Sequence, residues 1–240
     1  MRVWARALLL FWLTAPAWAG GVTIQWLGHS CFLIVSPGGT RVLTDPYPPM
    51  LGYSTTRVAA DLVTISIDEF DHSHVAMAEG RPRVLHGLTL EGEWTEVRTE
   101  CGDVKVRGIG AWQDDSHGKE RGKNGMFLFE TGGLRILHVG NLGHQLSDEQ
   151  LEKIGRVDVL LVPVGGIYTL DGNQAAALTR KVAPRVAIPM HYKTPALVFD
   201  LQTNEKYLRN FPKYQSARKL SLEAAKLPAA TTVYVLDFRP

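Results

Sequence analysis

A nearly continuous apolar segment in the second half of the chain constrains the fold most strongly. Residues Val157–Val164 are almost all aliphatic. A strand with one face in water alternates apolar and polar side chains, whereas a strand covered on both faces does not. The segment therefore predicts a buried strand with structure packed on both of its sides.

The surrounding pattern predicts how that strand is covered. Strands are expected at Val22–Leu27, Cys31–Ser36, Arg41–Thr44, Leu62–Ser66, Asp103–Gly108, Met126–Glu130, Leu134–Val139, Arg185–Met190 and Thr232–Phe238. Ser147 with Gln150 three residues later is a helix-start pattern, and a second helix is expected at Asn173–Val182, ended by Pro184. Strands with intervening helices predict an α/β layered sandwich in a single domain, residues 20–240.

The first 19 residues are typical of a cleavable signal peptide. Arg2 and Arg6 precede an apolar run, and Ala17-Trp18-Ala19 is a small-x-small cleavage pattern. The run is short for a membrane span of about 20 residues, and no later segment is apolar enough to span a bilayer. We therefore expect a periplasmic or secreted protein with no transmembrane segment after cleavage. That compartment permits disulfides, but we expect Cys31 to be a buried thiol.

The charge balance argues against a nucleic-acid partner. The chain has 26 Lys and Arg against 24 Asp and Glu, and removal of Arg2 and Arg6 brings the two counts level. Binding to the phosphate backbone needs a basic excess or a clustered basic face.

Polar residues gather in short segments that follow the predicted strands. Among them, Asp71, His72 and His191 carry a carboxylate and two imidazoles, the donor types that zinc and similar divalent ions take. Each alone is more often an ordinary hydrogen-bonded residue. In layered α/β folds, ligands bind where strand ends converge, so these three are the candidate metal ligands.

Taken together, these segments resemble the metallo-β-lactamase superfamily, and within it the branch of ascorbate-6-phosphate lactonase-like hydrolases. The matching stretches are Trp26-Leu27-Gly28-His29-Ser30, Leu43-Thr44-Asp45-Pro46, Asp71-His72, His138-Val139-Gly140-Asn141-Leu142-Gly143-His144, Pro163-Val164-Gly165-Gly166 and Pro189-Met190-His191-Tyr192. The resemblance implies a four-layer αββα sandwich with a metal pocket at one edge.

The same resemblance implies that several metal ligands are replaced. The family's His-x-His-x-Asp-His motif falls on Ile67, Glu69, Asp71 and His72, and a further ligand histidine falls on Gln113. The bridging aspartate of the family is replaced by Asn141. The family's early aspartate and its last histidine are both present, as Asp45 and His191. Isoleucine has no donor atom and an amide oxygen is a poor zinc ligand, so a two-metal centre is not expected.

Two interpretations of this pocket, with Asp45, Ile67, Glu69, Gln113 and Asn141 around it, remain open. In the first, which we favour, the pocket is metal-free and its neutral amides avoid the repulsion of clustered carboxylates. In the second, Asp71, His72 and His191 hold one divalent ion, zinc by donor type, with Asn141 as a weak further ligand. Glu69 is then the candidate general base.

Three functions follow from these interpretations. The favoured one is a catalytically impaired homologue, a pseudoenzyme that binds a ligand or a protein partner. The second is a single-metal hydrolase of an ester, lactone or phosphoester. The third is a scaffold or assembly protein of the cell envelope, because the fold alone does not determine function. Arg121, Lys123 and Lys193 lie in matching segments and are candidate contacts for a small anionic ligand.

Overall fold

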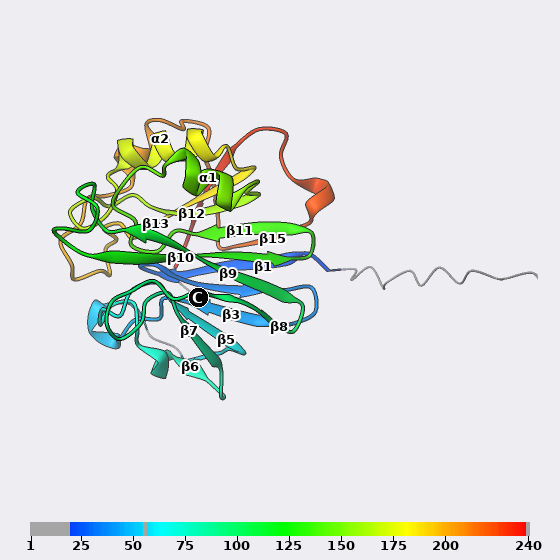
Figure 1. Cartoon of the computed structure of the whole chain (residues 1–240). Coiled ribbons are helices and arrows are strands. Elements are labelled where there is room, and N and C mark those ends of the chain that lie inside the picture. The colour runs from blue at the N-terminus through cyan, green and yellow to red at the C-terminus, as the bar shows by residue number, and fades with distance from the viewer. Residues whose placement is uncertain (1–19, 55–56, 239–240) are drawn as a thin grey trace, which may run out of the picture.

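Two β-sheets stacked face to face form the centre of the molecule (Figure 1). The computed structural model describes residues 20–54 and 57–238. The first sheet has the strand order β15-β1-β2-β3-β5-β7. Its strands are β1 (Val22–Gly28), β2 (Cys31–Val35), β3 (Arg41–Thr44), β5 (Leu62–Ile65), β7 (Arg83–His86) and β15 (Lys219–Leu222).

The second sheet is larger and mixes antiparallel and parallel strands. Its order is β14-β16-β13-β12-β11-β10-β9-β8. Its strands are β8 (Arg98–Cys101), β9 (Val104–Trp112), β10 (Lys123–Thr131), β11 (Leu134–His138), β12 (Val159–Pro163), β13 (Val186–Met190), β14 (Gln215–Ala217) and β16 (Thr232–Leu236). The buried apolar segment predicted from the sequence is β12, which is buried at every position and lies between β11 and β13.

The larger of the two hydrophobic clusters lies largely between the sheets. It includes the fully buried rings of Trp26, Phe32, Phe127 and Phe129. Burial of apolar side chains of this size contributes about 1.5–3 kcal/mol each. Burial alternates along β1, so every second residue is buried and the residues between are only partly buried.

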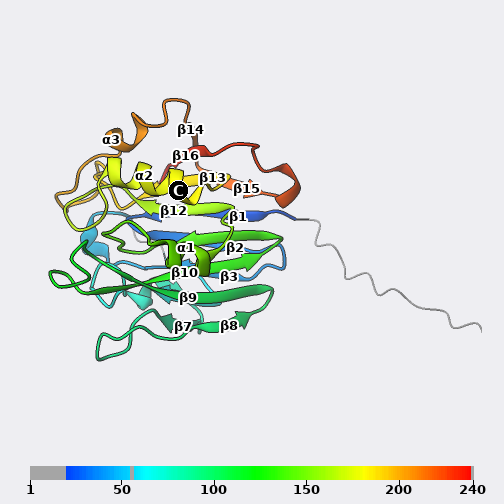
Figure 2. The ribbon, with the colours of Figure 1, turned by 45° about the horizontal axis from the view of Figure 1, so that its top comes forward.

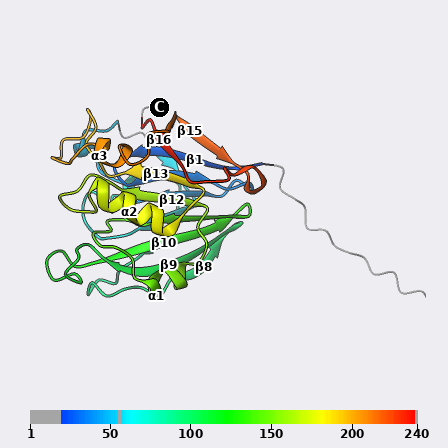
Figure 3. The ribbon, with the colours of Figure 1, turned by 90° about the horizontal axis from the view of Figure 1, so that it is seen from above.

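Helices cover the outer face of the second sheet (Figures 2 and 3). They are α1 (Asp148–Ile154), α2 (Gly172–Val182) and α3 (Glu205–Leu208). The predicted helix start is confirmed, because Ser147 and Gln150 form a reciprocal capping box. A second capping box joins Asp171 to Gln174 at the start of α2.

The outer face of the first sheet is covered by irregular structure. Short 3₁₀ turns, η1 (Pro49–Leu51) and η2 (Val75–Met77), and the small sheet of β4 (Val58–Ala59) and β6 (Ala78–Glu79) pack over it. A third 3₁₀ turn, η3 (Ala224–Lys226), follows β15. The predicted α/β sandwich is therefore confirmed, with its helices gathered on one outer side.

The predicted signal peptide lies outside the described residues. Within those residues, no helix is long and apolar enough to cross a membrane. Cys31 is buried, as predicted, and both Cys31 and Cys101 are free thiols.

The backbones of the two sheets approach closely at a pair of glycines. A Cβ atom built on Gly125 of β10 lies 2.5 Å from the Cα of Gly87, which directly follows β7. The Gly125 amide also donates to the carbonyl of Ser66 at 2.9 Å. Only glycine fits at this point, so the distance between the sheets depends on it.

We predict that Gly125→Ala destabilises the fold by about 1–3 kcal/mol, because the added methyl group overpacks the contact. Gly20→Ala is the matched control, since a Cβ there meets nothing within 4 Å. Urea denaturation of the two variants measures the difference. An alanine at position 125 with the stability of the control would contradict the close contact.

A buried carboxylate organises the loop that follows β9. Asp114 accepts hydrogen bonds from the amides of Ser116 (3.0 Å), Gly118 (2.8 Å) and Arg121 (2.8 Å). Burial opposes ionisation, but the hydrogen bonds from Ser116 and the backbone amides outweigh it and lower the pKa of Asp114 to about 2. The ionised form therefore holds the loop beside Gln113.

We predict that Asp114→Asn lowers the free energy of unfolding at pH 7 by about 1–3 kcal/mol. Because the folded pKa is depressed, this stabilisation is complete above the unfolded pKa of about 4 and is lost as the pH falls toward 2. Denaturation of both proteins from pH 7 to pH 2 should show the difference shrinking. A difference that stays constant across this range would contradict the ionised role.

Candidate metal centre

Four buried side chains converge at one edge of the sandwich. His29, Asp71, His72 and His191 each offer one donor atom, and these atoms all lie within 4.8 Å of one another. His29 lies in the turn from β1 to β2, Asp71 and His72 in the loop after β5, and His191 directly after β13. None is more than 6% exposed. These four residues are the metal cluster below.

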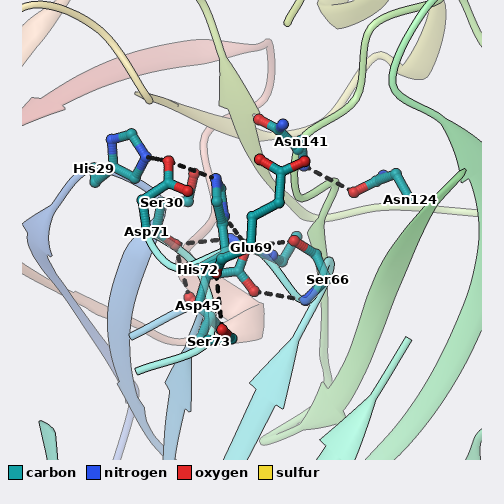
Figure 4. Close-up of polar contacts among 12 residues, drawn as sticks. His29, Ser30, Asp45, Ser66, Glu69, Asp71, His72, Ser73, Asn124 and Asn141 are labelled. Carbon is teal, nitrogen blue, oxygen red and sulfur yellow. Dashed lines mark hydrogen bonds and ion pairs between the residues drawn. The ribbon is translucent and has the colours of Figure 1, made fainter. Parts of the chain in front are cut away.

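The donors of the metal cluster have few partners besides one another. His29 Nε2 lies 2.9 Å from Asp71 Oδ2, and His72 Nε2 lies 3.5 Å from the same oxygen (Figure 4). Burial lowers the pKa of His29 and of His191, which favours neutral rings with free lone pairs. Burial raises the pKa of Asp71, but the hydrogen bond from His29 and nearby imidazoles outweigh it, so the net shift is downward and the carboxylate is ionised.

A second carboxylate orients His72 from behind. Asp45 Oδ2 lies 2.9 Å from His72 Nδ1, and its two oxygens also accept from the amide (2.8 Å) and hydroxyl (2.5 Å) of Ser66. Burial lowers the pKa of His72, but the hydrogen bond to Asp45 and the nearby carboxylates outweigh it, so the net shift is upward. In the neutral ring, a proton on Nδ1 leaves the lone pair on Nε2, and that nitrogen is buried without a hydrogen-bond partner. A carboxylate that fixes the tautomer of a histidine in this way is typical of metal ligands.

Three residues of this region adopt left-handed backbone conformations. The φ angles are 50° at His29, 37° at Asp45 and 51° at His191. Each costs about 1–2 kcal/mol for a residue with a side chain. The His29 carbonyl accepts from Trp26 Nε1 and from the His191 amide, both at 2.9 Å. The surrounding fold therefore holds these left-handed residues in place, so the donor atoms are positioned before any ion binds.

The other predicted pocket residues lie beside the metal cluster. Gln113 Nε2 donates to the carbonyls of Arg121 (2.9 Å) and Lys123 (3.1 Å), while its Oε1 accepts from Asn141 Nδ2 at 2.9 Å. The amide of Gln113 is thus fully engaged. Asn141 Oδ1 is buried and has no hydrogen-bond partner, and Ile67, which follows Ser66 in the chain, is also buried.

Glu69 is the one carboxylate of the pocket with much of its surface in solvent. Its side chain extends toward Asn141 (Figure 4). Partial burial raises the pKa of Glu69, partly offset by the nearby His72. The position suits a group that exchanges protons with a bound water.

The structure brings the three predicted ligands Asp71, His72 and His191 together. Sequence reasoning missed His29 as a member of the cluster, although it lies in one of the stretches that carry the resemblance. The signal that could have found it is its place in Gly28-His29-Ser30, a polar turn directly after the predicted strand Val22–Leu27. His138 and His144 lie outside the cluster, because they bond the Ser30 carbonyl and the Trp112 amide.

Two of the three predicted anion contacts have protein partners instead. Lys193 Nζ donates to the carbonyls of Leu197 and Phe199. Lys123 pairs with Glu93. Among the described residues, only Arg121 of the three has neither a carboxylate partner nor a side-chain hydrogen bond, and its guanidinium lies 5.8 Å from the centre of the Tyr168 ring.

The metal cluster fits a divalent ion. Three imidazoles and a carboxylate are the donor set of zinc and similar ions. An ion also satisfies the unpartnered Nε2 of His72, which otherwise costs desolvation energy. The cluster is therefore a candidate site for one divalent metal.

Relatives of known name share most of the chain. A protein from Carboxydothermus hydrogenoformans, named UPF0173 metal-dependent hydrolase, is 31% identical over 200 residues, 74% of this chain and 88% of its own length. One of the same name from Archaeoglobus fulgidus is 29% identical over 85% of this chain and 95% of its own.

A crystal structure from Thermotoga maritima shares the fold. That protein is proposed to be a Zn-dependent hydrolase of the metallo-β-lactamase superfamily. It is 33% identical, with a TM-score of 0.71, covering 90% of this chain and 98% of its own.

These findings correct the favoured prediction of a metal-free pseudoenzyme with a degenerate site. The relatives are named metal-dependent hydrolases, and the structure holds four convergent donors. The prediction was wrong because it counted ligands by the family motif alone. The replacements at Ile67, Gln113 and Asn141 do not affect the four donors of the metal cluster.

The model of the β-lactamase superfamily domain matches residues 23–191, which include most strands of both sheets and every residue of the metal cluster. Together with the relatives above, this match shows that the chain belongs to the metallo-β-lactamase superfamily, within the UPF0173 family of metal-dependent hydrolases.

Proposed function

We propose that the protein is a hydrolase that uses one divalent ion, with zinc as the metal, to cleave an ester, a lactone or a phosphoester. The observation that carries the proposal is the unpartnered Nε2 of His72, which Asp45 aims into a buried group of donors. A lactone substrate would agree with the ascorbate-6-phosphate lactonase-like branch that the sequence resembles. The predicted export of the mature chain would place this activity in the periplasm or outside the cell.

In this proposal Asp71, His72 and His191 hold the ion. His29 donates from Nε2 to Asp71 Oδ2 and so orients the carboxylate. Three protein ligands leave a position open for substrate or water, the arrangement of catalytic zinc sites. A bound ion of this kind acts as a Lewis acid on the scissile carbonyl or phosphoryl group and makes a nearby water more acidic.

The other pocket residues act on the water and the substrate. Glu69 accepts the proton of the attacking water, and the free Oδ1 of Asn141 accepts a hydrogen bond that orients it. The hydroxyl of that water adds to the acyl carbon or phosphorus, the bond from that atom to the leaving oxygen breaks, and Glu69 returns the proton to the leaving oxygen. Arg121, with no carboxylate partner among the described residues, is the proposed contact for an anionic substrate group.

We predict that zinc-loaded protein carries about one metal ion per chain. His191→Ala should abolish zinc binding, because one of the three ligands is lost. His29→Gln keeps a donor toward Asp71, so it should retain the metal with about 10–100-fold weaker affinity, as expected for a group that orients a ligand. Chelator competition and elemental analysis measure both. A wild-type chain that stays metal-free in excess zinc would contradict the proposal.

We predict that Glu69→Gln lowers kcat by about 10²–10⁴-fold while metal content stays unchanged, because the proton acceptor is lost. Asp68→Asn is the matched control, an exposed carboxylate next in the chain that should leave kcat unaltered. Rates with nitrophenyl esters and phosphoesters test both variants. Equal rates for Glu69→Gln and wild type would remove Glu69 from the reaction.

A further inference from the structure

Two phenylalanines from different loops meet beside the metal cluster. Phe70 directly precedes Asp71, and Phe199 lies in the loop after β13. Their ring centroids are 5.7 Å apart and the rings meet edge to face at 76°. Phe70 is 54% exposed. An aromatic ring in water contributes little to the stability of its loop. Phe70 therefore leaves an aromatic face open to solvent beside the partly buried ring of Phe199.

The pair is continuous with the metal cluster. The Phe199 ring packs edge to face on His29, with centroids 6.0 Å apart. His29 in turn lies 4.2 Å from His191, centroid to centroid. The apolar surface therefore begins where the metal donors end. A molecule that reaches the cluster on this side has to lie against Phe199 and Phe70.

The loop that carries Phe199 is held rigidly. Lys193 Nζ donates to the carbonyls of Leu197 (2.9 Å) and Phe199 (2.5 Å). The Leu197 amide donates to Thr194 Oγ1 at 3.2 Å, and the Leu197 side chain is buried. An ammonium group that bonds backbone carbonyls fixes the course of the loop. Phe199, partly buried against the core, is thus held in a set position before any ligand arrives, which lowers the entropy cost of binding.

We propose that Phe70 and Phe199 form an apolar wall of the substrate site, and that the substrates are carboxylic esters or lactones with an apolar chain or ring beside the scissile bond. This inference rests on the proposed hydrolase function and narrows its substrate class. Small, fully polar phosphoesters gain nothing from such a wall. Apolar groups gain from every methylene that the two rings cover.

Zinc-loaded protein assayed with nitrophenyl acetate, butyrate and octanoate tests the wall. The expected kcat/KM rises with acyl length, by up to about fourfold for each methylene that is fully covered. Phe70→Ala and Phe199→Ala should each lose at least about tenfold more on octanoate than on acetate, because several covered methylenes return to water. Phe199→Leu should recover part of the loss on octanoate.

Val198→Ala is the matched control, because Val198 is 63% exposed in the same loop and makes no ring contact. Metal content is measured for each variant, which separates loss of the wall from loss of the ion. Calorimetry of octanoate and acetate binding to the same proteins gives a readout that does not depend on turnover. Phe70→Ala should lower the affinity for octanoate more than the affinity for acetate.

The outcomes separate the two proposals. A loaded wild-type protein that hydrolyses neither these esters nor nitrophenyl phosphoesters, yet binds octanoate through Phe70, would overturn the hydrolase and leave the wall a binding role only. A wild-type profile that is flat with acyl length, or equal losses on acetate and octanoate, would overturn the wall alone. Concentration-dependent self-association abolished by Phe70→Ala would assign the pair to a second copy of the chain and would also overturn it.

Discussion

The hydrogen bond between Asp45 and His72 is the interaction on which the rest of the site depends. Both side chains are fully buried, so the ionised carboxylate is tolerated only because Ser66 and His72 satisfy it. The same bond fixes which nitrogen of His72 carries the proton. Without it, the ring could turn or change tautomer, and its Nε2 would no longer face Asp71 and His191.

The sandwich supplies the geometry that this interaction needs. Asp45 follows β3 and Ser66 follows β5, and the two strands pair in parallel so that their ends meet at one edge. His191 follows β13 of the other sheet, and its amide donates to the carbonyl of His29. The two sheets therefore each contribute donors to the cluster, and left-handed corners turn those donors inward. The strain of these corners is offset by the packing around them.

Much of this arrangement could be predicted from the sequence, and the limits have physical causes. The buried run of β12 and the capping box at Ser147 are local patterns, and both are confirmed. His29 was missed as a cluster member because its contact with Asp71, 42 residues away, depends on sheet topology. The partners of Lys193 were missed for a similar reason, since they depend on how the following loop folds back.

The mistaken expectation of a pseudoenzyme shows the same limit. Replaced ligands at Ile67, Gln113 and Asn141 are visible in the sequence, but their consequence depends on which donors remain close together in space. Gln113 and Asn141 bond each other beside the metal cluster, while His72 keeps its free nitrogen. Loss of the ligands of one metal position therefore leaves the donors of the neighbouring position in place.

A crystal structure of the protein soaked in zinc, with anomalous scattering at the zinc edge, tests this account most directly. The account predicts a single strong peak about 2.0–2.2 Å from a carboxylate oxygen of Asp71 and from one ring nitrogen each of His72 and His191. It also predicts that Asp45 keeps its hydrogen bond to His72 Nδ1. A peak centred instead between Glu69, Gln113 and Asn141, or no peak at saturating zinc, would contradict it.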